Sequence, residues 1–460
     1  MITLTTLTTV MMRQFPLLAA ALCAASVSTV AQTTTAQPTQ RAQPATTTSD
    51  TLTSSFNVDG IPVILRRNTS NNVVAANVYL LGGVRQVTSA NAGIEPFLLS
   101  VSERGTLNYP KAILRRKVSL LGSDYVVAPS VDWTLFGTRT ITSVLDSTWA
   151  IFADRLMRPA LQPAEVELVR AQALSAVRQE RDDPDQLVSD LADSVAFAGH
   201  PYAIAVTGTE ASLRAITAAD LRAYEQSQIV KSRMLVVVVG NVTRSHLESL
   251  IHQTLGKLPQ GTYKWTLPAP MPVTPTSSVL VQRSLPTNYI LGYFAGPPAS
   301  SPEYTALRVA STVLTGQMFA EIRGRQNLTY DVHSPFLERA ASASGLYVTT
   351  VAPDTTLKLM RSFTNQLKVE TVTDEGLDRL ELQFITQYFL DNETNGSQAD
   401  FLARSQLYQG DYQHAARFVS ELKSVTPQAV RDAARRYAKN FHWAYVGDTS
   451  KVNRHLLESF

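Results

Sequence analysis

The chain has 460 residues, which is long enough for two or three domains that each bury a hydrophobic core. Hydrophobic residues make up 44% of it and charged residues 17%, a composition that excludes a chain disordered throughout. Lys and Arg number 41 against 38 Asp and Glu, and a net charge of only +3 predicts no nucleic-acid partner.

Residues 1–31 have the pattern of a signal peptide. Arg13 is the only charged residue before an apolar run at 15–25 that is too short to span a bilayer, and small residues follow up to Ala31. Leu22, directly before Cys23, disfavours a lipoprotein signal. We therefore expect an exported protein, soluble in the periplasm or outside the cell, with no membrane span and no cysteine after cleavage.

Two low-complexity stretches divide the rest of the chain. Residues 32–51 are almost entirely Thr, Gln, Ala, Pro and Ser, which predicts a disordered tether. Residues 265–276 contain four prolines, which remove backbone donors and favour extended geometry, and they predict a linker. The expected domains are therefore 52–264 and 277–460.

The two predicted domains resemble each other. In the first, a helix beginning after Thr217 is followed by an apolar strand ending at Gly240. In the second, a helix beginning after Thr426 is followed by a strand ending at Gly447. Both threonines are suited to cap a helix N-terminus. The fold class that we predict is α+β, with two tandem homologous domains, each a mostly antiparallel β-sheet covered by helices.

The remaining patterns place strands and helices along both domains. Alternating apolar residues predict strands at 73–81 and 289–293. Helices are expected at 92–104, 144–156, 163–180, 185–197, 302–322, 355–369, 374–391 and 397–409.

Short motifs in order over about four hundred residues identify a family resemblance. They lie at 57–65, 81–85, 93–100, 105–110, 181–184, 200–202, 208–209, 292–298 and 321–323. With these motifs, the chain resembles the insulinase (pitrilysin) family of zinc peptidases, specifically its short two-domain members related to mitochondrial processing peptidase. The resemblance implies a clamshell of two similar domains.

The resemblance also shows what this chain lacks. The family carries His-x-x-Glu-His on the helix after a Gly-Ile or Gly-Leu pair, and a Glu about 76 residues further on completes the zinc site. The corresponding positions here are Pro96, Leu99, Ser100 and Ala176. No histidine precedes His200, so no shift of the alignment restores the ligands. We expect no metal site and no catalytic residue on this chain, and zinc in a partner subunit.

A second family feature is kept. Arg323 and Tyr330 are seven residues apart, as are the Arg and Tyr that the family places in its non-zinc half. The resemblance implies that they bind substrate, because guanidinium and phenol can donate hydrogen bonds to a peptide carbonyl and its oxyanion. Asn327 tolerates a left-handed conformation, which would turn the chain and bring the two side chains together.

Other candidates have simpler explanations. Arg325 is expected to be a solvated neighbour, and residues 200–202 a packed loop. His246 and His252 are six apart and do not share a helix face, so both are expected on the surface. The acidic segment 181–185 predicts the end of one helix and the start of the next. The basic cluster 115–117 is expected at the solvated edge of a strand or in a loop.

These observations favour a non-catalytic subunit of an exported hetero-oligomeric zinc peptidase. Its expected partners are a zinc-bearing subunit of the same family and a peptide substrate, and Arg323 and Tyr330 would contribute to a shared chamber. A non-enzymatic scaffold of the cell envelope is one alternative, and a peptide-binding protein that works alone as a homodimer is another.

Overall fold

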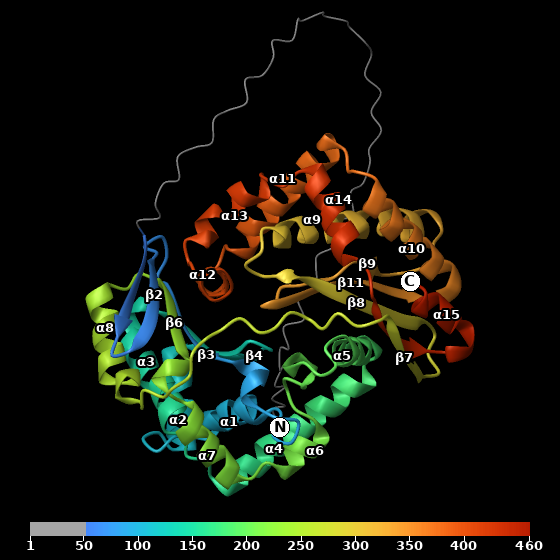
Figure 1. Ribbon diagram of the computed structural model, residues 1–460. Helices are drawn as coiled ribbons and strands as arrows, with labels where there is room; N and C mark the ends of the chain where they lie inside the picture. Colours follow the sequence, from blue (N-terminus) through green and yellow to red (C-terminus); the bar gives the residue numbers. More distant parts are fainter. Residues whose placement is uncertain (1–51) are drawn as a thin grey trace, which may run out of the picture. The chain divides into compact units, whose positions relative to one another are not determined.

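The computed structural model describes residues 52–460 (Figure 1). The predicted signal peptide and tether lie outside the described residues. Secondary structure in the described part falls into two consecutive sets, each with its own β-sheet.

The first sheet has six strands in the order β1-β2-β6-β3-β5-β4. Strands β2 and β6 pair in parallel, and the other neighbours pair antiparallel. The strands are β1 (Thr53–Val58), β2 (Ile61–Arg67), β3 (Val73–Leu81), β4 (Asp124–Pro129), β5 (Trp133–Ile141) and β6 (Met234–Gly240).

The second sheet has the order β10-β11-β8-β12-β7, with β9 also paired to β11. Only β12 and β7 pair in parallel in this sheet. The strands are β7 (Ser277–Gln282), β8 (Asn288–Pro298), β9 (Val332–His333), β10 (Phe336–Leu337), β11 (Ala341–Thr350) and β12 (His442–Gly447).

The two sheets share one topology, since β2-β6-β3-β5-β4 corresponds to β7-β12-β8-β11-β10. The correspondence extends to the glycines that end β6 and β12. A Cβ at Gly240 would lie 2.8 Å from the Val73 carbonyl oxygen, and one at Gly447 would lie 2.4 Å from the Asn288 side chain. Neither site therefore leaves room for a Cβ beside the first residue of the adjacent strand. The predicted fold class, two similar domains with mostly antiparallel sheets covered by helices, is confirmed.

Helices surround both sheets. Those of the first half are α1 (Ile94–Val101), α2 (Lys111–Leu121), α3 (Leu145–Met157), α4 (Pro163–Asp182), α5 (Pro184–Ala196), α6 (Glu210–Ala215), α7 (Ala218–Gln228) and α8 (Arg244–Gln253). Those of the second half are α9 (Glu303–Met318), α10 (Pro353–Val369), α11 (Asp374–Asp391), α12 (Asn395–Gln409), α13 (His414–Leu422), α14 (Pro427–Tyr437) and α15 (Arg454–Glu458).

Each sheet packs one face on helices of its own half. In the first half, α1, α3, α4, α7 and α8 contribute apolar side chains to a core beneath β2, β3 and β6. In the second half, α9, α10 and α14 do the same beneath β8, β11 and β12. Burial of this apolar surface is the main source of stability in such layers.

The other face of each sheet is covered by a helix from the opposite half. Leu402 and Ala403 of α12 pack among side chains of the first sheet that include Tyr79 and Val237. Val188 and Ala192 of α5 pack against the second sheet. Figure 1 shows α5 beside β7 and β8, although α5 belongs to the first half of the chain. Each half therefore packs one helix on the sheet of the other half, and we call these two helices, α5 and α12, the exchanged helices. The apolar surface that they bury joins the two halves.

Most predicted helices are present within a few residues of their expected bounds. Thr217 and Thr426 cap α7 and α14 through their side-chain oxygens, as predicted. Residues 115–117 are exposed, as predicted, but the predicted strand edge or loop was wrong. They lie in the middle of α2, because the apolar residues Leu114, Val118 and Leu121 recur at helical spacing. Among residues 52–460, no helix combines the length and apolar character that crossing a membrane requires.

Candidate functional site

Helix α1 begins in a turn that only glycine fits well. Gly93 precedes the helix with φ 83°, in the left-handed region, and a Cβ there would lie 2.5 Å from the Thr207 carbonyl oxygen. A Cβ on Gly208 would lie 2.6 Å from the Ala92 carbonyl oxygen. This mutual close approach fixes the start of α1 against the loop that leads into α6.

The residues at the positions of the zinc motif lie on α1 but provide no ligand. Leu99 is 1% exposed and belongs to the core of the first half, whereas Pro96 and Ser100 are half-buried. Pro96 stands at the third helical position, where a backbone N–H has no partner inside the helix, so the helix tolerates it. Pro96 and Ser100 are four residues apart and share a helix face.

Helix α4 runs antiparallel to α1, and two contacts set the register. Near the start of α1, Thr207 packs on Gly93 and donates a hydrogen bond to Glu180 of α4 at 3.4 Å. Beyond the other end of α1, Arg104 Nη2 donates to Gln172 Oε1 at 2.9 Å. Ser100 lies one turn before Arg104, and Ala176 lies one turn after Gln172. The register therefore places these two positions in the same part of the helix pair.

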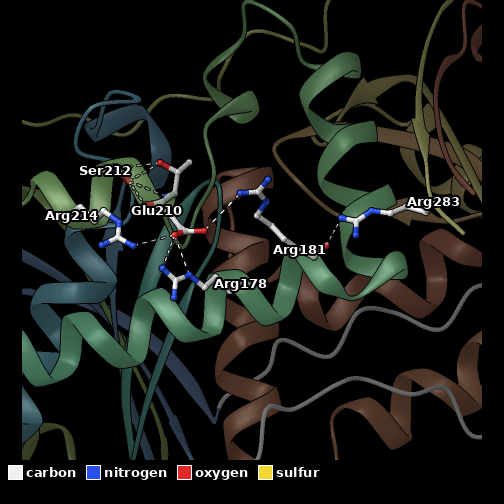
Figure 2. A network of polar contacts seen from close by, with 7 residues as sticks. Arg178, Arg181, Glu210, Ser212, Arg214 and Arg283 are labelled. Atoms are coloured by element: carbon white, nitrogen blue, oxygen red, sulfur yellow. Dashed lines mark hydrogen bonds and ion pairs between the residues drawn. The ribbon is translucent and has the colours of Figure 1, made fainter. Parts of the chain in front are cut away.

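The C-terminal end of α4 is held by a network centred on Glu210. Figure 2 shows three arginines turned toward this carboxylate: Arg178 at 3.0 Å, Arg214 at 3.4 Å and Arg181 at 3.8 Å. The hydrogen bond from Arg178 holds the pKa of Glu210 below its usual value. Glu210 is the first residue of α6 and follows Gly208 closely in the chain, so the network ties α4 to the loop that packs against the start of α1.

The chemistry of this helix pair does not fit Zn²⁺. Zinc requires imidazole, thiolate or carboxylate ligands, whereas Pro96, Ser100 and Ala176 offer a ring, a hydroxyl and a methyl group. Arg104 adds a positive charge, and its buried Nε has no hydrogen-bond partner in the described residues. Within residues 52–460, no group of three or more His, Cys, Asp or Glu side chains could hold a metal ion.

The one carboxylate on α1 is engaged elsewhere. Glu95 is 4% exposed, and its Oε2 contacts Arg233 Nη1 at 2.9 Å and accepts a hydrogen bond from Tyr224 at 2.9 Å. Burial lowers the pKa of Arg233, but the charge interactions and hydrogen bonds with Glu95 and Tyr224 together outweigh this and leave that pKa raised. Glu95 is therefore a structural partner of Arg233, buried beside Pro96.

The structure brings Arg323 and Tyr330 together. Helix α9 continues into a π-helix at Phe319–Arg325, and Asn327 then adopts the left-handed conformation with φ 51°. The turn puts Arg323 Cζ 5.0 Å from the centre of the Tyr330 ring and 4.8 Å from that of Phe319. The left-handed Asn327 and the convergence of the pair are confirmed. Tyr330 is 76% exposed, so its hydroxyl is accessible.

A set of polar side chains that the sequence did not single out continues from this pair. Asp331 contacts His333 Nδ1 at 3.3 Å, and this hydrogen bond, with a further contribution from Arg323, holds the pKa of Asp331 below its usual value. The His333 ring lies 4.7 Å from the Tyr347 ring, and the Tyr347 hydroxyl donates to Asp185 of α5. The Arg-Tyr pair is thus linked to the exchanged helix of the first half.

The remaining candidates lie where their simpler explanations place them. Arg325 is exposed and pairs with Glu321 at 3.1 Å. His200 is buried and packs against Phe197 and Tyr202. His246 and His252 are on the surface. Asp183 caps the start of α5 directly after α4, as the segment 181–185 predicted.

These features define a two-domain α+β protein with a degenerate metal position in its first half and an Arg-Tyr pair in its second. A sequence model of the protein family described as "Insulinase (Peptidase family M16)" matches residues 62–210. A second family model, described as "Peptidase M16 inactive domain", matches residues 215–384. The chain belongs to the insulinase family, peptidase family M16.

Relatives and solved structures agree with this assignment. The chain is 25% identical over 256 residues to the beta subunit of mitochondrial-processing peptidase from Blastocladiella emersonii, covering 56% of this chain and 55% of that protein. It is 25% identical over 253 residues to subunit 1 of the human cytochrome b-c1 complex, covering 55% and 53%. These two matches therefore span only about half the length of each relative.

Other similarities extend over nearly the whole length. An uncharacterized zinc protease of Mycobacterium leprae is 23% identical over 404 residues, with 84% of this chain and 89% of that protein covered. A solved peptidase M16 inactive domain from Pseudomonas fluorescens superimposes with a TM-score of 0.78 at 19% identity, covering 86% of this chain and 98% of that one. A protease structure from Helicobacter pylori gives 0.78 at 17% identity, covering 86% and 99%. The structural matches show that the fold is shared.

Proposed function

We propose that the chain is the non-catalytic subunit of an exported, hetero-oligomeric zinc peptidase of the insulinase family. The observation that carries the proposal is the contrast between the two halves. The position of the zinc motif is filled by side chains that cannot bind the metal, whereas Arg323 and Tyr330 face each other beside solvent. A zinc-bearing relative would supply the metal and the activated water.

In this proposal, Arg323 and Tyr330 bind the peptide substrate. Both side chains are hydrogen-bond donors, and donors held in place before the reaction stabilise charge that develops on a peptide carbonyl oxygen. The π-helix and the left-handed Asn327 hold the pair in one geometry. The names of two relatives support assembly with other chains, because they are subunits of a processing peptidase and of a cytochrome complex.

The test combines the purified chain with a relative that carries an intact His-x-x-Glu-His motif. The chain alone should contain no stoichiometric zinc and cleave no peptide, and the mixture should cleave a fluorogenic peptide. Arg323→Ala and Tyr330→Phe should each lower kcat/KM of the mixture by about 10²-fold, the typical effect of losing one oxyanion donor. Arg325→Ala is the matched control and should leave the activity unchanged. Full activity of the mixture with Arg323→Ala and with Tyr330→Phe would show that neither side chain binds the substrate.

Two alternatives predict different results. A scaffold of the cell envelope should co-purify with partners that include no protein with His-x-x-Glu-His. A peptide-binding protein that works alone should bind an unstructured peptide in calorimetry without any partner, and that binding should weaken in Arg323→Ala.

A further inference from the structure

Helix α2 presents an outward face on which exposed apolar residues lie between basic ones. Ile113 is 46% exposed and Leu120 is 75% exposed, and they lie seven residues apart, about two turns of the helix. Arg116 and Lys117 follow Ile113 at the third and fourth positions, so all four side chains share one side of α2. We call these four residues the basic helix face. Large exposed apolar side chains grouped on a surface are typical of an interaction site.

The four side chains of this face form an apolar stripe with a cation on each side. Because an α-helix turns by about 100° per residue, Ile113 and Leu120 form one line along α2, and Arg116 and Lys117 stand about 50° to either side of that line. On the inward side Leu114 is buried, and α2 packs on α3 and on the turn Ser102–Arg104. The face is therefore formed before any partner arrives, and binding need not order the helix.

The positive charge of α2 is not balanced locally. Residues 111–121 contain four basic residues and no acidic one. Lys111 pairs with Glu165 of α4 at 2.6 Å, whereas the other three basic residues of the helix form no ion pair with any described residue. An anionic partner would therefore find cationic groups that are already exposed.

Acidic side chains on the elements packed against α2 do not supply the missing charge. Glu103, in the turn Ser102–Arg104, contacts Arg155 at 3.1 Å. On α3, Asp146 and Asp154 are each paired with a basic side chain. The basic helix face therefore keeps its positive charge toward solvent, and this charge favours an anionic partner.

The chemistry of this face fits a lipid surface better than a protein partner. A helix that lies on a membrane places apolar side chains between the lipid headgroups and carries lysine and arginine beside them. The long stems of Arg116 and Lys117 let their charged ends reach phosphate oxygens while Ile113 and Leu120 lose water. Protein interfaces rely more on aromatic anchors that fill pockets, and none of the four residues of this face is aromatic.

We propose that the basic helix face docks the chain on the surface of a bilayer that contains anionic phospholipid. Helix α2 then lies along the surface, with Ile113 and Leu120 among the headgroups and with Arg116 and Lys117 against phosphates on either side. Two apolar side chains bury little area, and each cation near an anionic surface adds only a modest attraction. Binding is therefore reversible, depends on both kinds of side chain and weakens as salt is raised.

Co-sedimentation with vesicles tests the proposal. It uses the chain without the predicted signal peptide, because the apolar run at 15–25 would itself bind lipid. The chain should bind vesicles of phosphatidylcholine that contain about one third phosphatidylglycerol, and it should not bind pure phosphatidylcholine. R116E/K117E should bind at least about tenfold more weakly, because the charged contact becomes repulsive. I113S/L120S should also bind more weakly but should keep the preference for phosphatidylglycerol, since the cations remain.

Two matched controls separate this face from the general charge and apolar character of the surface. K257E/K264E makes the same change in net charge as R116E/K117E, at exposed residues outside α2. L382S/F389S removes two exposed apolar side chains from α11. Both controls should bind vesicles like the unchanged chain. Circular dichroism should show that every variant is folded, which is expected because all substituted residues are exposed.

A fluorescent label locates the contact on the protein. Cys23 is the only cysteine and lies in the predicted signal peptide, so Leu120→Cys gives the processed chain a single thiol. The emission of an environment-sensitive dye on that thiol should shift to shorter wavelength when vesicles with phosphatidylglycerol are added. The same dye on Leu382→Cys should show no shift.

Several results would overturn the proposal. They are a chain that ignores phosphatidylglycerol at low salt, equal binding by R116E/K117E and the unchanged chain, or an equal loss of binding in K257E/K264E. If the chain ignored vesicles but bound immobilised polyglutamate, and R116E/K117E did not, the basic helix face would belong to an acidic protein partner instead. The proposal stands apart from the proposed function, because Arg323→Ala should leave vesicle binding unchanged.

Discussion

The carboxylate of Asp132 accepts a hydrogen bond from the Tyr408 hydroxyl at 2.9 Å, and this bond joins the two halves of the chain. Asp132 directly precedes β5 of the first half and is completely buried, whereas Tyr408 belongs to the exchanged helix α12. The same carboxylate accepts a hydrogen bond from the Ala340 backbone N–H at 3.0 Å and another from the Tyr202 hydroxyl. A buried carboxylate is thus satisfied by donors from both halves.

Removal of the Tyr408 hydroxyl should destabilise the protein measurably. Tyr408→Phe leaves a buried carboxylate with one donor fewer, and we expect the free energy of unfolding to fall by about 1–3 kcal/mol. Burial and the nearby Asp132 raise the pKa of Tyr408, so the hydroxyl remains a donor at neutral pH. Tyr263→Phe is a matched control, because the buried Tyr263 hydroxyl has no hydrogen-bond partner in the described residues. If urea unfolding showed the same loss of free energy of unfolding in Tyr408→Phe and Tyr263→Phe, the hydrogen bond from Tyr408 to Asp132 would not stabilise the protein.

The turn before α1 should tolerate no side chain. Gly93→Ala combines a left-handed conformation with a Cβ 2.5 Å from the Thr207 carbonyl oxygen, and it should lower the free energy of unfolding by about 3 kcal/mol or more. Gly122 is also left-handed, with φ 59°, but a Cβ there meets nothing within 4 Å. Gly122→Ala should therefore cost only about 1 kcal/mol. If urea unfolding gave the two variants a similar loss of free energy of unfolding, the contact with Thr207 would not be the reason that position 93 needs glycine.

Buried histidines should make the protein less stable in mild acid. Burial lowers the pKa of His200, and its Nδ1 accepts a hydrogen bond from the Tyr202 backbone N–H at 3.1 Å, so the neutral ring is the form that fits. His442 is also buried, and burial lowers its pKa. A histidine whose pKa is lower in the folded state binds fewer protons there than in the unfolded state. Its stabilising effect is therefore complete above the unfolded value of about 6.5 and is lost as the pH falls toward the folded value.

The measurement is the free energy of unfolding in urea between pH 7.5 and pH 5. The slope below pH 6.5 should decrease in His200→Gln by up to about 1.4 kcal/mol per pH unit, the limit for one proton. His252→Gln controls for loss of an imidazole from the surface. An unchanged slope in His200→Gln would mean that His200 does not titrate with unfolding.

Periodic apolar residues and caps were enough to predict the fold class and most helices. Helix α11 has the expected bounds, and the thirteen-residue α5 begins one residue before its predicted start. Both amphipathic patterns extend over at least three turns, where helical spacing is distinctive. Helix α2 was missed because four basic side chains and Ser119 interrupt its apolar residues. The pattern there shows only one narrow buried stripe.

Other features of the structure are contacts between residues far apart in the sequence, and the local sequence pattern does not predict such contacts. The apolar stripe of α5 or α12 shows that each helix packs on something, but not that the sheet it covers belongs to the other half. Arg323 and Tyr330 could be expected to converge because a single Asn turn separates them. The contacts of His333 with Tyr347, and of Tyr347 with Asp185, join strands and a helix far apart in the chain, and no spacing predicts them.

Restoring three ligands should give the first half a zinc site. Pro96→His and Ser100→His place two imidazoles four residues apart on one face of α1, and Ala176→Glu adds a carboxylate from the facing part of α4. Leu99 is kept because it is 1% exposed in the core, where a charged side chain would destabilise the fold. After dialysis, the triple variant should retain one equivalent of zinc by elemental analysis. Adding Arg104→Gln should tighten binding, because a guanidinium repels the cation.

The control for this variant is an imidazole pair at the same spacing with no facing carboxylate. Ala112→His and Arg116→His place such a pair on the outward side of α2. It should bind zinc far more weakly than the triple variant, because two ligands leave the tetrahedral shell incomplete. If the triple variant held no more zinc than this control, the register inferred from the contact between Arg104 and Gln172 would be wrong. The positions of the lost ligands would then have to lie elsewhere on the two helices.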